Sequence, residues 1–260
     1  MIINFEKYHG TGNDFVLIDD RALTFPENDL KLIKHLCNLK FGIGSDGLML
    51  IRNSNEADFE MIFFNPDGSK SLCGNGSRCA VHFAHKMQIC QDSGTFITTD
   101  GAHDFRVIDS DLIAVEMRDV YRPEKHGGNW FLDTGSPHII IQVDEVDEVD
   151  VMTEGRKLRN DAVYIPINGT NVNFVSESKM NGIFKVRTYE RGVEAETLSC
   201  GTGVTAVALA MNLENKVDHK AEIQTRGGNL LVEFQRKGAR FTNIWLTGPA
   251  KYVFSGQIHA

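Results

Sequence analysis

The feature that most constrains this chain is an internal repeat. A cysteine followed by Gly-x-Gly occurs twice, at Cys73 in SLCGNGSRCAVHFAHK and at Cys200 in LSCGTGVTAVALAM. A glycine-containing segment precedes each cysteine at a similar distance, HGTGNDFVLID around Gly12 and FLDTGSPHIIIQV around Gly135. The two cysteines lie more than 100 residues apart, which exceeds the roughly 20–50 residues of a solenoid unit. The sequence therefore predicts a duplicated domain.

The segments that follow the two cysteines indicate the architecture. AVHFA and VTAVALAM are apolar almost all the way round a helix, which is typical of a helix buried on most faces. We expect these helices at about 76–87 and 203–213. Strands follow each helix, TFITTD, HDFRVID and LIAVEM in one half and AEIQTRG, NLLVEF and FTNIWLT in the other. The expected fold is α+β, with two pseudo-symmetric domains, each a mostly antiparallel sheet or barrel wrapped around a central buried helix.

The predicted domains are 1–119 and 120–249, with a tail at about 250–260 that can pack back on the first domain. The boundary is placed near Val120 to Gly128, because YRPEKHGG supplies proline, glycine and charge. A chain of 260 residues is near the upper size of a single core, so two domains are reasonable. The acidic run DEVDEVDV predicts the solvated approach to a surface helix at about 149–159.

Composition excludes several classes of function. A net charge of −8 argues against a nucleic-acid-binding protein, which needs a basic surface. No apolar run approaches the roughly 20 residues of a membrane span, and the opening MIINFEKYHG is not typical of a signal peptide. Five cysteines cannot all pair with one another within the chain, so we interpret them as thiols of a cytoplasmic protein.

The position of Cys73 and Cys200, each directly before a helix, suits acid–base chemistry. A helix N-terminus carries partial positive charge and N–H groups without helical partners, so it lowers the pKa of a thiol and can hold a carboxylate. Inverting a carbon stereocentre by proton transfer needs a base on one face and an acid on the other. One cysteine on each face of a bound amino acid would supply both. Cys37, Cys79 and Cys90 lack this context and are predicted to be small core residues.

At this point the chain resembles the diaminopimelate epimerases along its whole length. The resemblance rests on motifs that occur in the same order: GTGNDF at 10–15, GIGSDG at 42–47, NPDGS at 65–69, LCGNGSRCA at 72–80, GSPH at 135–138, TNVNF at 170–174, YERG at 189–192 and ETLSCGTG at 196–203. It implies interconversion of L,L- and meso-2,6-diaminopimelate for lysine and peptidoglycan synthesis, with no metal and no cofactor such as pyridoxal phosphate. It also implies a homodimer.

The resemblance carries roles onto individual residues. Cys73 and Cys200 correspond to the acid–base pair, and His138 and Glu190 to groups that tune their pKa. The N–H groups expected to hold the reacting carboxylate belong to Gly74, Asn75, Gly201 and Thr202. The residues expected to hold the far amino-acid head are Asn13, Asn65, Asn171, Glu190 and Arg191, and Ser136 is a further substrate-binding candidate.

Two positions depart from the family pattern. Ser136 stands where the family usually has asparagine, so a hydroxyl or a bridging water would replace an amide contact. The segment between Arg191 and Cys200 is one residue longer than the commonest form, which affects the expected loop geometry.

Four other interpretations of the sequence compete with this one. GIGSDG fits a dinucleotide-binding pattern, but a helix is expected before it and a strand after it, the reverse of what that site needs. Cys79, His82 and His85 could be metal ligands, but their helical spacing spreads them round the axis. A proline or hydroxyproline racemase would use the same sulfur pair without needing the YERG motif. An inert amino-acid-binding module would not need both cysteines.

Overall fold

The computed structural model describes residues 1–178 and 182–259, and these form two compact units. Met1–Val115 and Gly248–Ala260 make up the first unit, and Glu116–Thr247 the second. The segment 120–128, where the sequence places the boundary, lies inside the second unit. It holds the short strands β8 (Val120–Tyr121) and β9 (Glu124–His126), which pair with β17 and β10 respectively.

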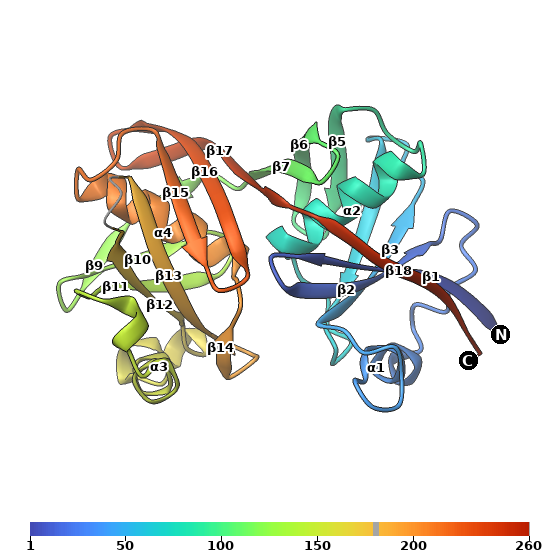
Figure 1. Cartoon of the computed structure of the whole chain (residues 1–260), viewed down its shortest axis with the longest axis horizontal. Helices are drawn as coiled ribbons and strands as arrows, with labels where there is room; N and C mark the ends of the chain where they lie inside the picture. The colour runs from blue at the N-terminus through green and yellow to red at the C-terminus, as the bar shows by residue number, and fades with distance from the viewer. Residues whose placement is uncertain (179–181, 260) are drawn as a thin grey trace. The chain divides into compact units, whose positions relative to one another are not determined.

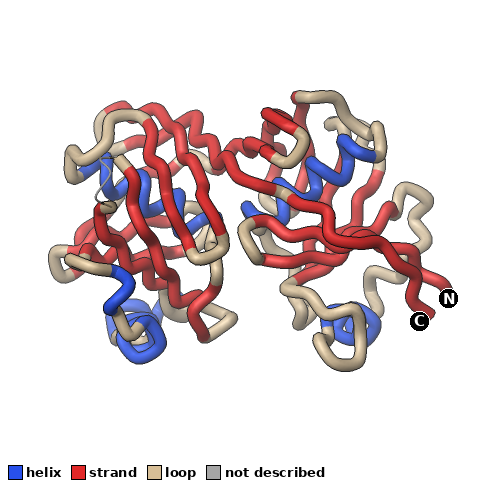
Figure 2. Tube along the Cα trace, viewed as in Figure 1, coloured by secondary structure: helices blue, strands red, loops and turns tan. Residues whose placement is uncertain are grey.

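The first unit is a mixed, mostly antiparallel sheet that wraps one helix (Figures 1 and 2). Its strands are β1 (Ile2–Gly10), β2 (Asn13–Asp19), β3 (Gly47–Arg52), β4 (Phe59–Phe64), β5 (Ser93–Thr98), β6 (Gly101–Asp109), β7 (Leu112–Met117) and β18 (Lys251–His259). They pair in the order β18-β1-β2-β3-β4-β5-β6-β7, and only β2–β3 and β4–β5 are parallel among these pairs of described strands.

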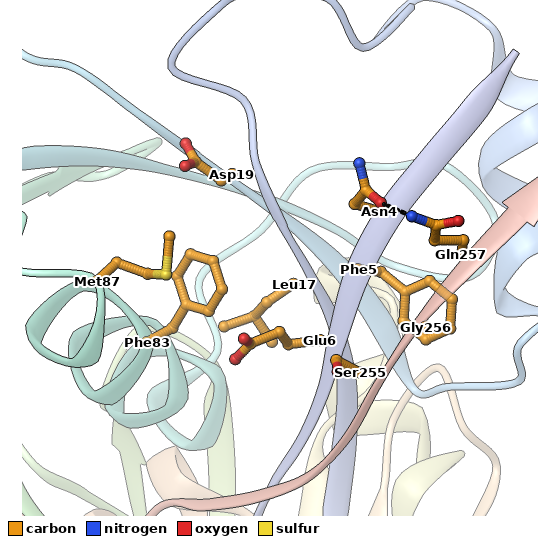
Figure 3. A pocket seen from close by; sticks show the side chains of 10 residues that line it. All are labelled: Asn4, Phe5, Glu6, Leu17, Asp19, Phe83, Met87, Ser255, Gly256 and Gln257. Carbon is orange, nitrogen blue, oxygen red and sulfur yellow. Dashed lines mark hydrogen bonds between the residues drawn. The ribbon is translucent and has the colours of Figure 1, made fainter.

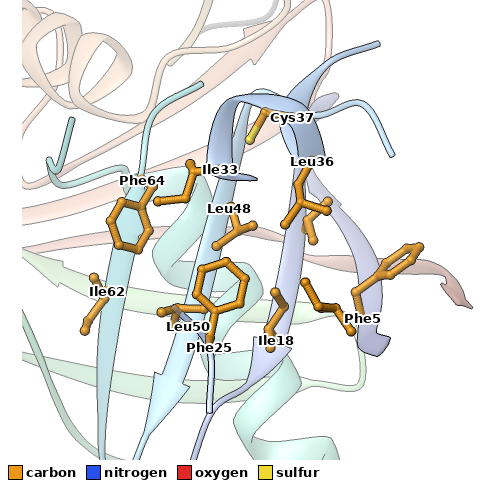
Figure 4. Packing of buried hydrophobic residues seen from close by; sticks show 12 residues of the cluster. Phe5, Ile18, Phe25, Ile33, Leu36, Cys37, Leu48, Leu50, Ile62 and Phe64 are labelled. Atoms are coloured by element: carbon orange, nitrogen blue, oxygen red, sulfur yellow. The ribbon is translucent and has the colours of Figure 1, made fainter. Parts of the chain in front are cut away.

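Both faces of this sheet are covered. Helix α2 (Gly74–Lys86) lies against β1, β2, β3 and β4. On the opposite face, α1 (Leu30–Cys37) packs Ile33 and Leu36 onto alternate strand residues such as Leu48 and Leu50 (Figure 4). Because successive side chains of a strand point to opposite faces, a strand covered on both sides is apolar throughout. This accounts for the buried run of β3.

The second unit repeats this arrangement. Its strands besides β8 and β9 are β10 (Asn129–Asp133), β11 (Pro137–Gln142), β12 (Asn171–Glu177), β13 (Ile183–Glu190), β14 (Ala195–Thr197), β15 (Lys220–Thr225), β16 (Gly228–Lys237) and β17 (Arg240–Pro249). The order β10-β11-β12-β13-β15-β16-β17 has parallel pairs at β11–β12 and β13–β15, the same places as in the first unit. This match confirms the predicted pseudo-symmetric α+β fold.

The helices of the second unit also correspond to those of the first. Helix α4 (Gly201–Leu213) contacts β10, β11, β12, β15 and β16, and nearly all of its residues are buried. Helix α3 (Val151–Arg159) covers the other face, where Val151 packs with Val172 and Tyr189. Short 3-10 turns flank it at Val146–Glu148 and Ala162–Ile167. No helix among the described residues is both long and apolar enough to cross a membrane.

Candidate active site

Cys73 and Cys200 occupy the same structural position in the two units. Each is the N-cap residue of its buried helix and has an extended backbone, with φ −133° and ψ 111° at Cys73 and φ −124° and ψ 112° at Cys200. Both helices therefore begin directly after the cysteine, two residues earlier than the sequence predicts. The first helical bonds run from Ser77 to the Cys73 carbonyl and from Val204 to the Cys200 carbonyl. The preceding N–H groups point out of the helix start.

The second glycine of each Gly-x-Gly packs closely against the sheet. A Cβ atom at Gly203 would lie 2.5 Å from Asn173 Oδ1, too close for any side chain. A Cβ atom at Gly76 would lie 3.1 Å from the Met49 terminal methyl group. Glycine at these positions lets the helix start sit directly on the sheet.

In the first unit, Cys73 lies beside two amides. Its Sγ is 3.6 Å from Asn13 Oδ1, and Asn75 Nδ2 donates to the same oxygen at 3.3 Å. The Asn13 amide nitrogen donates to Asp46 Oδ2 at 2.7 Å. The structure thus brings Asn13, Cys73 and Asn75 together, with Asp46 behind them.

Asn65 is held by its own loop. Its Nδ2 lies 3.0 Å from both Ser69 Oγ and Ser71 Oγ, and its backbone N–H donates to the Ser69 carbonyl at 2.8 Å. This loop leads from β4 into the Cys73 helix start, so Asn65 shapes the approach to Cys73.

Arg78 is a polar residue of this site that the sequence analysis did not single out. Its side chain is completely buried. It donates to the Gly74 carbonyl at 3.2 Å, to Asn75 Oδ1 at 2.8 Å and to the Pro249 carbonyl at 3.5 Å. Burial lowers the pKa of Arg78 to about 10, and the nearby thiols of Cys79 and Cys73 act in the opposite direction. The signal for it was a charged residue inside a helix predicted to be buried.

In the second unit, Cys200 is linked to His138 through a hydroxyl. Thr202 Oγ1 lies 3.4 Å from Cys200 Sγ and 2.9 Å from His138 Nε2. On the other side of the ring, His138 Nδ1 is 3.1 Å from Asn173 Nδ2. Asn173 Nδ2 also reaches the Ile139 carbonyl, and its Oδ1 accepts from Thr188, so this amide is oriented with its nitrogen towards the ring.

This orientation determines the tautomer of His138. Because Asn173 donates to Nδ1, that nitrogen is an acceptor and the ring proton is on Nε2. Nε2 then donates to Thr202 Oγ1, which leaves the Thr202 hydroxyl able to donate to Cys200 Sγ. Burial, with the positive charge of Arg191 as the second cause, lowers the pKa of His138 to about 3. The ring is therefore neutral at physiological pH.

A second cluster of predicted residues lies at the ends of β11, β12 and β13. Asn171 Nδ2 donates to Ser136 Oγ at 2.7 Å and to the Pro137 carbonyl at 2.9 Å, and its Oδ1 accepts from the Arg191 N–H at 2.9 Å. The Arg191 guanidinium donates to the carbonyls of Ile167 and Gly169 at 3.1 Å and 3.4 Å. Glu190 ends β13 beside them. Ser136 thus contacts Asn171, the asparagine that the family resemblance predicts to bind substrate.

The remaining cysteines lie in the core. Cys37, Cys79 and Cys90 are buried, and burial raises the pKa of all three, that of Cys90 to about 12. All five cysteines fall in the described ranges and all are thiols.

The two motifs that suggest other functions are the possible metal ligands on α2 and the segment GIGSDG. His82 faces Asp111 at 3.6 Å and His85 faces Asp92 at 2.9 Å. Within residues 1–178 and 182–259, no three His, Cys, Asp or Glu side chains are arranged to hold a metal ion. GIGSDG lies between α1 and β3, so a helix precedes it and a strand follows.

A groove of about 300 Å³ in the first unit is remote from this chemistry. It lies at the far end of α2 from Cys73, where Phe83 and Met87 face Glu6, Leu17 and Asp19 (Figure 3). Its walls carry no cysteine and no helix N-terminus among the residues that line it.

Known proteins are similar to this chain along nearly its whole length. The family model described as diaminopimelate epimerase matches residues 5–122 and 130–253. A diaminopimelate epimerase of Flavobacterium psychrophilum is 45% identical over 97% of this chain and 98% of its own length. One of Aquifex aeolicus is 39% identical, covering 98% of each chain.

Solved structures share the fold at much lower identity. A Bacillus anthracis phenazine biosynthesis protein of the PhzF family has a TM-score of 0.80 and 16% identity over 100% of both chains. A hydroxyproline epimerase from Agrobacterium vitis, with trans-4-hydroxy-L-proline bound, has a TM-score of 0.71 and 16% identity over 99% of this chain and 91% of its own.

Proposed function

The chain belongs to the diaminopimelate epimerase family and is an isomerase, and from that premise we propose that it interconverts L,L- and meso-2,6-diaminopimelate with Cys73 and Cys200 as the acid–base pair. The observation that carries the proposal is the repeated position of the two sulfurs, each at the N-cap of the buried helix of its own unit. No cofactor takes part in the proposed reaction.

The proposed reaction is a balanced exchange of protons. The thiolate of one cysteine removes the α-proton, so a C–H bond breaks and an S–H bond forms. The thiol of the other cysteine delivers its proton to the opposite face of the same carbon, so an S–H bond breaks and a C–H bond forms. The pair ends each turnover with its protonation states exchanged, and this readies it for the reverse reaction.

The reacting carboxylate would be held by backbone groups. The N–H groups of Gly74 and Asn75 in one unit, and of Gly201 and Thr202 in the other, belong to helix first turns, where N–H groups and the helix dipole favour an anion. The same positive ends would stabilise the charge that spreads onto the carboxylate when the α-proton leaves.

The far amino-acid head of the substrate needs groups of both signs. Arg191 offers a planar fork for a carboxylate, and Glu190 offers an acceptor for an ammonium. Asn13, Asn65 and Asn171 supply further polar contacts, and Ser136 adds a hydroxyl. The hydrogen bond from Asn171 to Ser136 supports a joint role for these two residues. His138 would tune Cys200 through Thr202.

The test is isotope incorporation in deuterated water. L,L-diaminopimelate should gain one α-deuterium as meso product forms, whereas L-proline and trans-4-hydroxy-L-proline should gain none. Mass spectrometry and chiral chromatography measure both quantities. Deuterium incorporation into proline instead would favour the proline-type racemase. Binding of diaminopimelate with no incorporation into any substrate would indicate an inert binding module.

We further infer a cytoplasmic homodimer that acts on a small diamino dicarboxylate and not on nucleic acid or membranes. Five thiols suit a reducing compartment, and a net charge of −8 is unsuited to nucleic acid. Strand β18 exposes Tyr252, Val253 and Phe254, which supports a subunit contact there. Light scattering coupled to size-exclusion chromatography should give twice the chain mass of 29.0 kDa, and a mass of one chain would contradict the dimer.

A further inference from the structure

Four polar side chains of the first unit form a chain of hydrogen bonds that begins and ends at a charge. Arg78 donates to Asn75 Oδ1 at 2.8 Å, Asn75 Nδ2 donates to Asn13 Oδ1 at 3.3 Å, and Asn13 Nδ2 donates to Asp46 Oδ2 at 2.7 Å. Cys73 is joined to this chain at its middle, because its Sγ lies 3.6 Å from the same Asn13 oxygen.

The two charged ends leave only one arrangement for the amides between them. A guanidinium can only donate, so the Asn75 atom that faces Arg78 must be its oxygen. Asn75 then presents its nitrogen to Asn13, so the Asn13 atom that accepts this bond must be its oxygen. The remaining Asn13 nitrogen meets the Asp46 carboxylate, which can only accept when ionised. Both ends therefore favour the same orientation of Asn13.

The ends differ in how firmly they are held. Arg78 and Asn75 are completely or almost completely buried, and Arg78 makes two further bonds to backbone carbonyls, so this end is rigid. Asp46 is exposed but also accepts the Asp14 N–H at 3.1 Å, which holds its carboxylate in place.

We propose that Arg78 and Asp46 are positioning residues for Cys73, because together they fix the Asn13 amide with its oxygen towards the Cys73 sulfur. The proposal rests on the proposed function only in that Cys73 is the reacting thiol. An amide oxygen accepts a proton and so favours the thiol, whereas an amide nitrogen in its place would favour the thiolate. This row of hydrogen bonds therefore helps Cys73 to hold the proton that it must deliver.

Other charges surround Cys73 and act on the same equilibrium. Arg78 lies on the same helix as Cys73, as does the thiol of Cys79. From the neighbouring strands and loop come Asp46 and Asp14, and Asp14 pairs with the ammonium of Lys7. A variant that changes one of these charges shifts Cys73 directly as well as through Asn13, so the experiment must separate the two routes.

The decisive experiment is a double-mutant cycle on Asp46→Asn and Asn13→Ala, read by the pH dependence of Cys73 alkylation with iodoacetamide. Peptide mass spectrometry follows Cys73 and Cys200 in the same sample, so Cys200 is an internal reference. Asparagine at 46 can donate as well as accept, so only the longer 3.3 Å bond from Asn75 still favours the Asn13 oxygen, and part of the population can turn the Asn13 nitrogen to Cys73. We expect the Cys73 midpoint to fall by roughly half to one pH unit in Asp46→Asn, with Cys200 unchanged.

In the Asn13→Ala background, the same Asp46→Asn change should move the Cys73 midpoint little. An equal shift in both backgrounds would show that the carboxylate acts through space and would overturn the proposal. No shift in either background, or a rise of the midpoint, would overturn it as well. Circular dichroism confirms that each variant is folded.

This measurement needs no substrate, so it is independent of the proposed reaction. If deuterium incorporation fails while the alkylation cycle behaves as expected, the proposed function is wrong and the orienting role of Asp46 stands. On active enzyme, Asp46→Asn should lower kcat/KM by about tenfold, the loss typical of one misplaced polar contact. The fall should lie mainly in kcat, because the change affects the proton held by Cys73.

Discussion

The starts of α2 and α4 have the same backbone and different side chains. In both, an extended cysteine caps the helix, and a side chain five residues later donates to the carbonyl of the residue after the cysteine. That side chain is Arg78 in the first unit, at 3.2 Å from the Gly74 oxygen, and Thr205 in the second, at 2.9 Å from the Gly201 oxygen. One brings a buried positive charge and the other a neutral hydroxyl.

The groups beside the two sulfurs differ in the same way. Cys73 faces an amide oxygen, which accepts, whereas Cys200 faces a threonine hydroxyl that the neutral His138 leaves able to donate. The two units share the backbone of the helix start and differ in the side chains beside each thiol, so we expect the two thiols to differ in proton affinity. Two chemically identical residues can thus differ in pKa within one enzyme.

The largest effect should come from replacing either sulfur. Cys73→Ser and Cys200→Ser should each lower epimerisation about a thousandfold, since a serine hydroxyl is too weak an acid to exchange protons here. Each variant keeps one thiol and can still exchange the α-proton on one face, so the two should incorporate deuterium into opposite stereoisomers. Cys90→Ala is the matched control and should keep full activity. More than a few per cent residual epimerisation in either serine variant would rule out the two-thiol reaction.

Replacing Arg78 or Thr205, the side chains five residues after each cysteine, should lower activity less, and by unequal amounts. Arg78→Met removes a buried charge and leaves three acceptors without their donor, so kcat/KM should fall by about tenfold or more, and the loss of the positive charge should raise the Cys73 pKa. Thr205→Val, its counterpart, should lower kcat/KM only about two- to threefold. Alkylation midpoints and steady-state rates measure both.

Arg78→Lys serves as a second variant if the methionine variant fails to fold. Lysine retains the charge but lacks the planar fork that reaches three acceptors, so the Cys73 pKa should stay near its wild-type value while kcat/KM falls. Equal losses from Arg78→Lys and Thr205→Val would remove the distinction between the two helix starts.

His138 should make the second unit sensitive to acid. Its folded pKa of about 3 lies below the ordinary histidine pKa of 6.5, so between these pH values the unfolded chain binds a proton that the folded chain does not. The free energy of unfolding should therefore fall as the pH drops below 6.5, by up to about 1.4 kcal/mol per pH unit from this one residue.

Urea unfolding of the wild type and of His138→Gln, from neutral pH to about pH 5, isolates this contribution. His82, whose pKa burial also lowers, remains in both proteins and cancels in the comparison. Parallel pH profiles for the two proteins would mean that the His138 ring is not held neutral.

A similarly small effect should come from the hydroxyl between His138 and Cys200. Thr202→Val removes a donor to Cys200, so the Cys200 pKa should rise by about half a unit and kcat/KM should fall about threefold. Thr202→Ser keeps the hydroxyl and should behave as wild type. Alkylation of Cys73 in the same sample should not change, and an equal shift of both thiols would contradict a local effect.

Much of the fold could be predicted from the sequence because its signals are local. The Cys-Gly-x-Gly motifs and the apolar runs after them locate both buried helices to within two residues. The predicted boundary, which starts the second domain at 120, rests on the linker-like composition of YRPEKHGG, and the structure divides the units after Val115. Val120–Tyr121 and Glu124–His126 add short strands to the edges of β17 and β10, and such pairing depends on distant partners.

The side chains around the cysteines were predictable only in part. Asn171 and Asn173 alternate with Val172 and Phe174 on β12, and Val172 and Phe174 pack towards α3. Two asparagines on the other face of an apolar strand could therefore be recognised from the sequence as candidate site residues. The bond between Asn173 and His138 could not be predicted, since it depends on the parallel register of β11 and β12. Asp46 lies in GIGSDG, which supports the family resemblance but gives Asp46 no role, and nothing in its sequence neighbourhood indicates Asn13.

The pairing of β1 with β18 affects the order in which the chain can mature during synthesis. The residues of the second unit are continuous, so a ribosome delivers all of them before β18 is made. The first unit, although its strands come first, must wait with the Ile2–Gly10 edge open until the Lys251–His259 segment emerges. An open edge is a template for pairing with other chains. The nascent chain thus completes its second half first, and its first half is exposed to aggregation for longer.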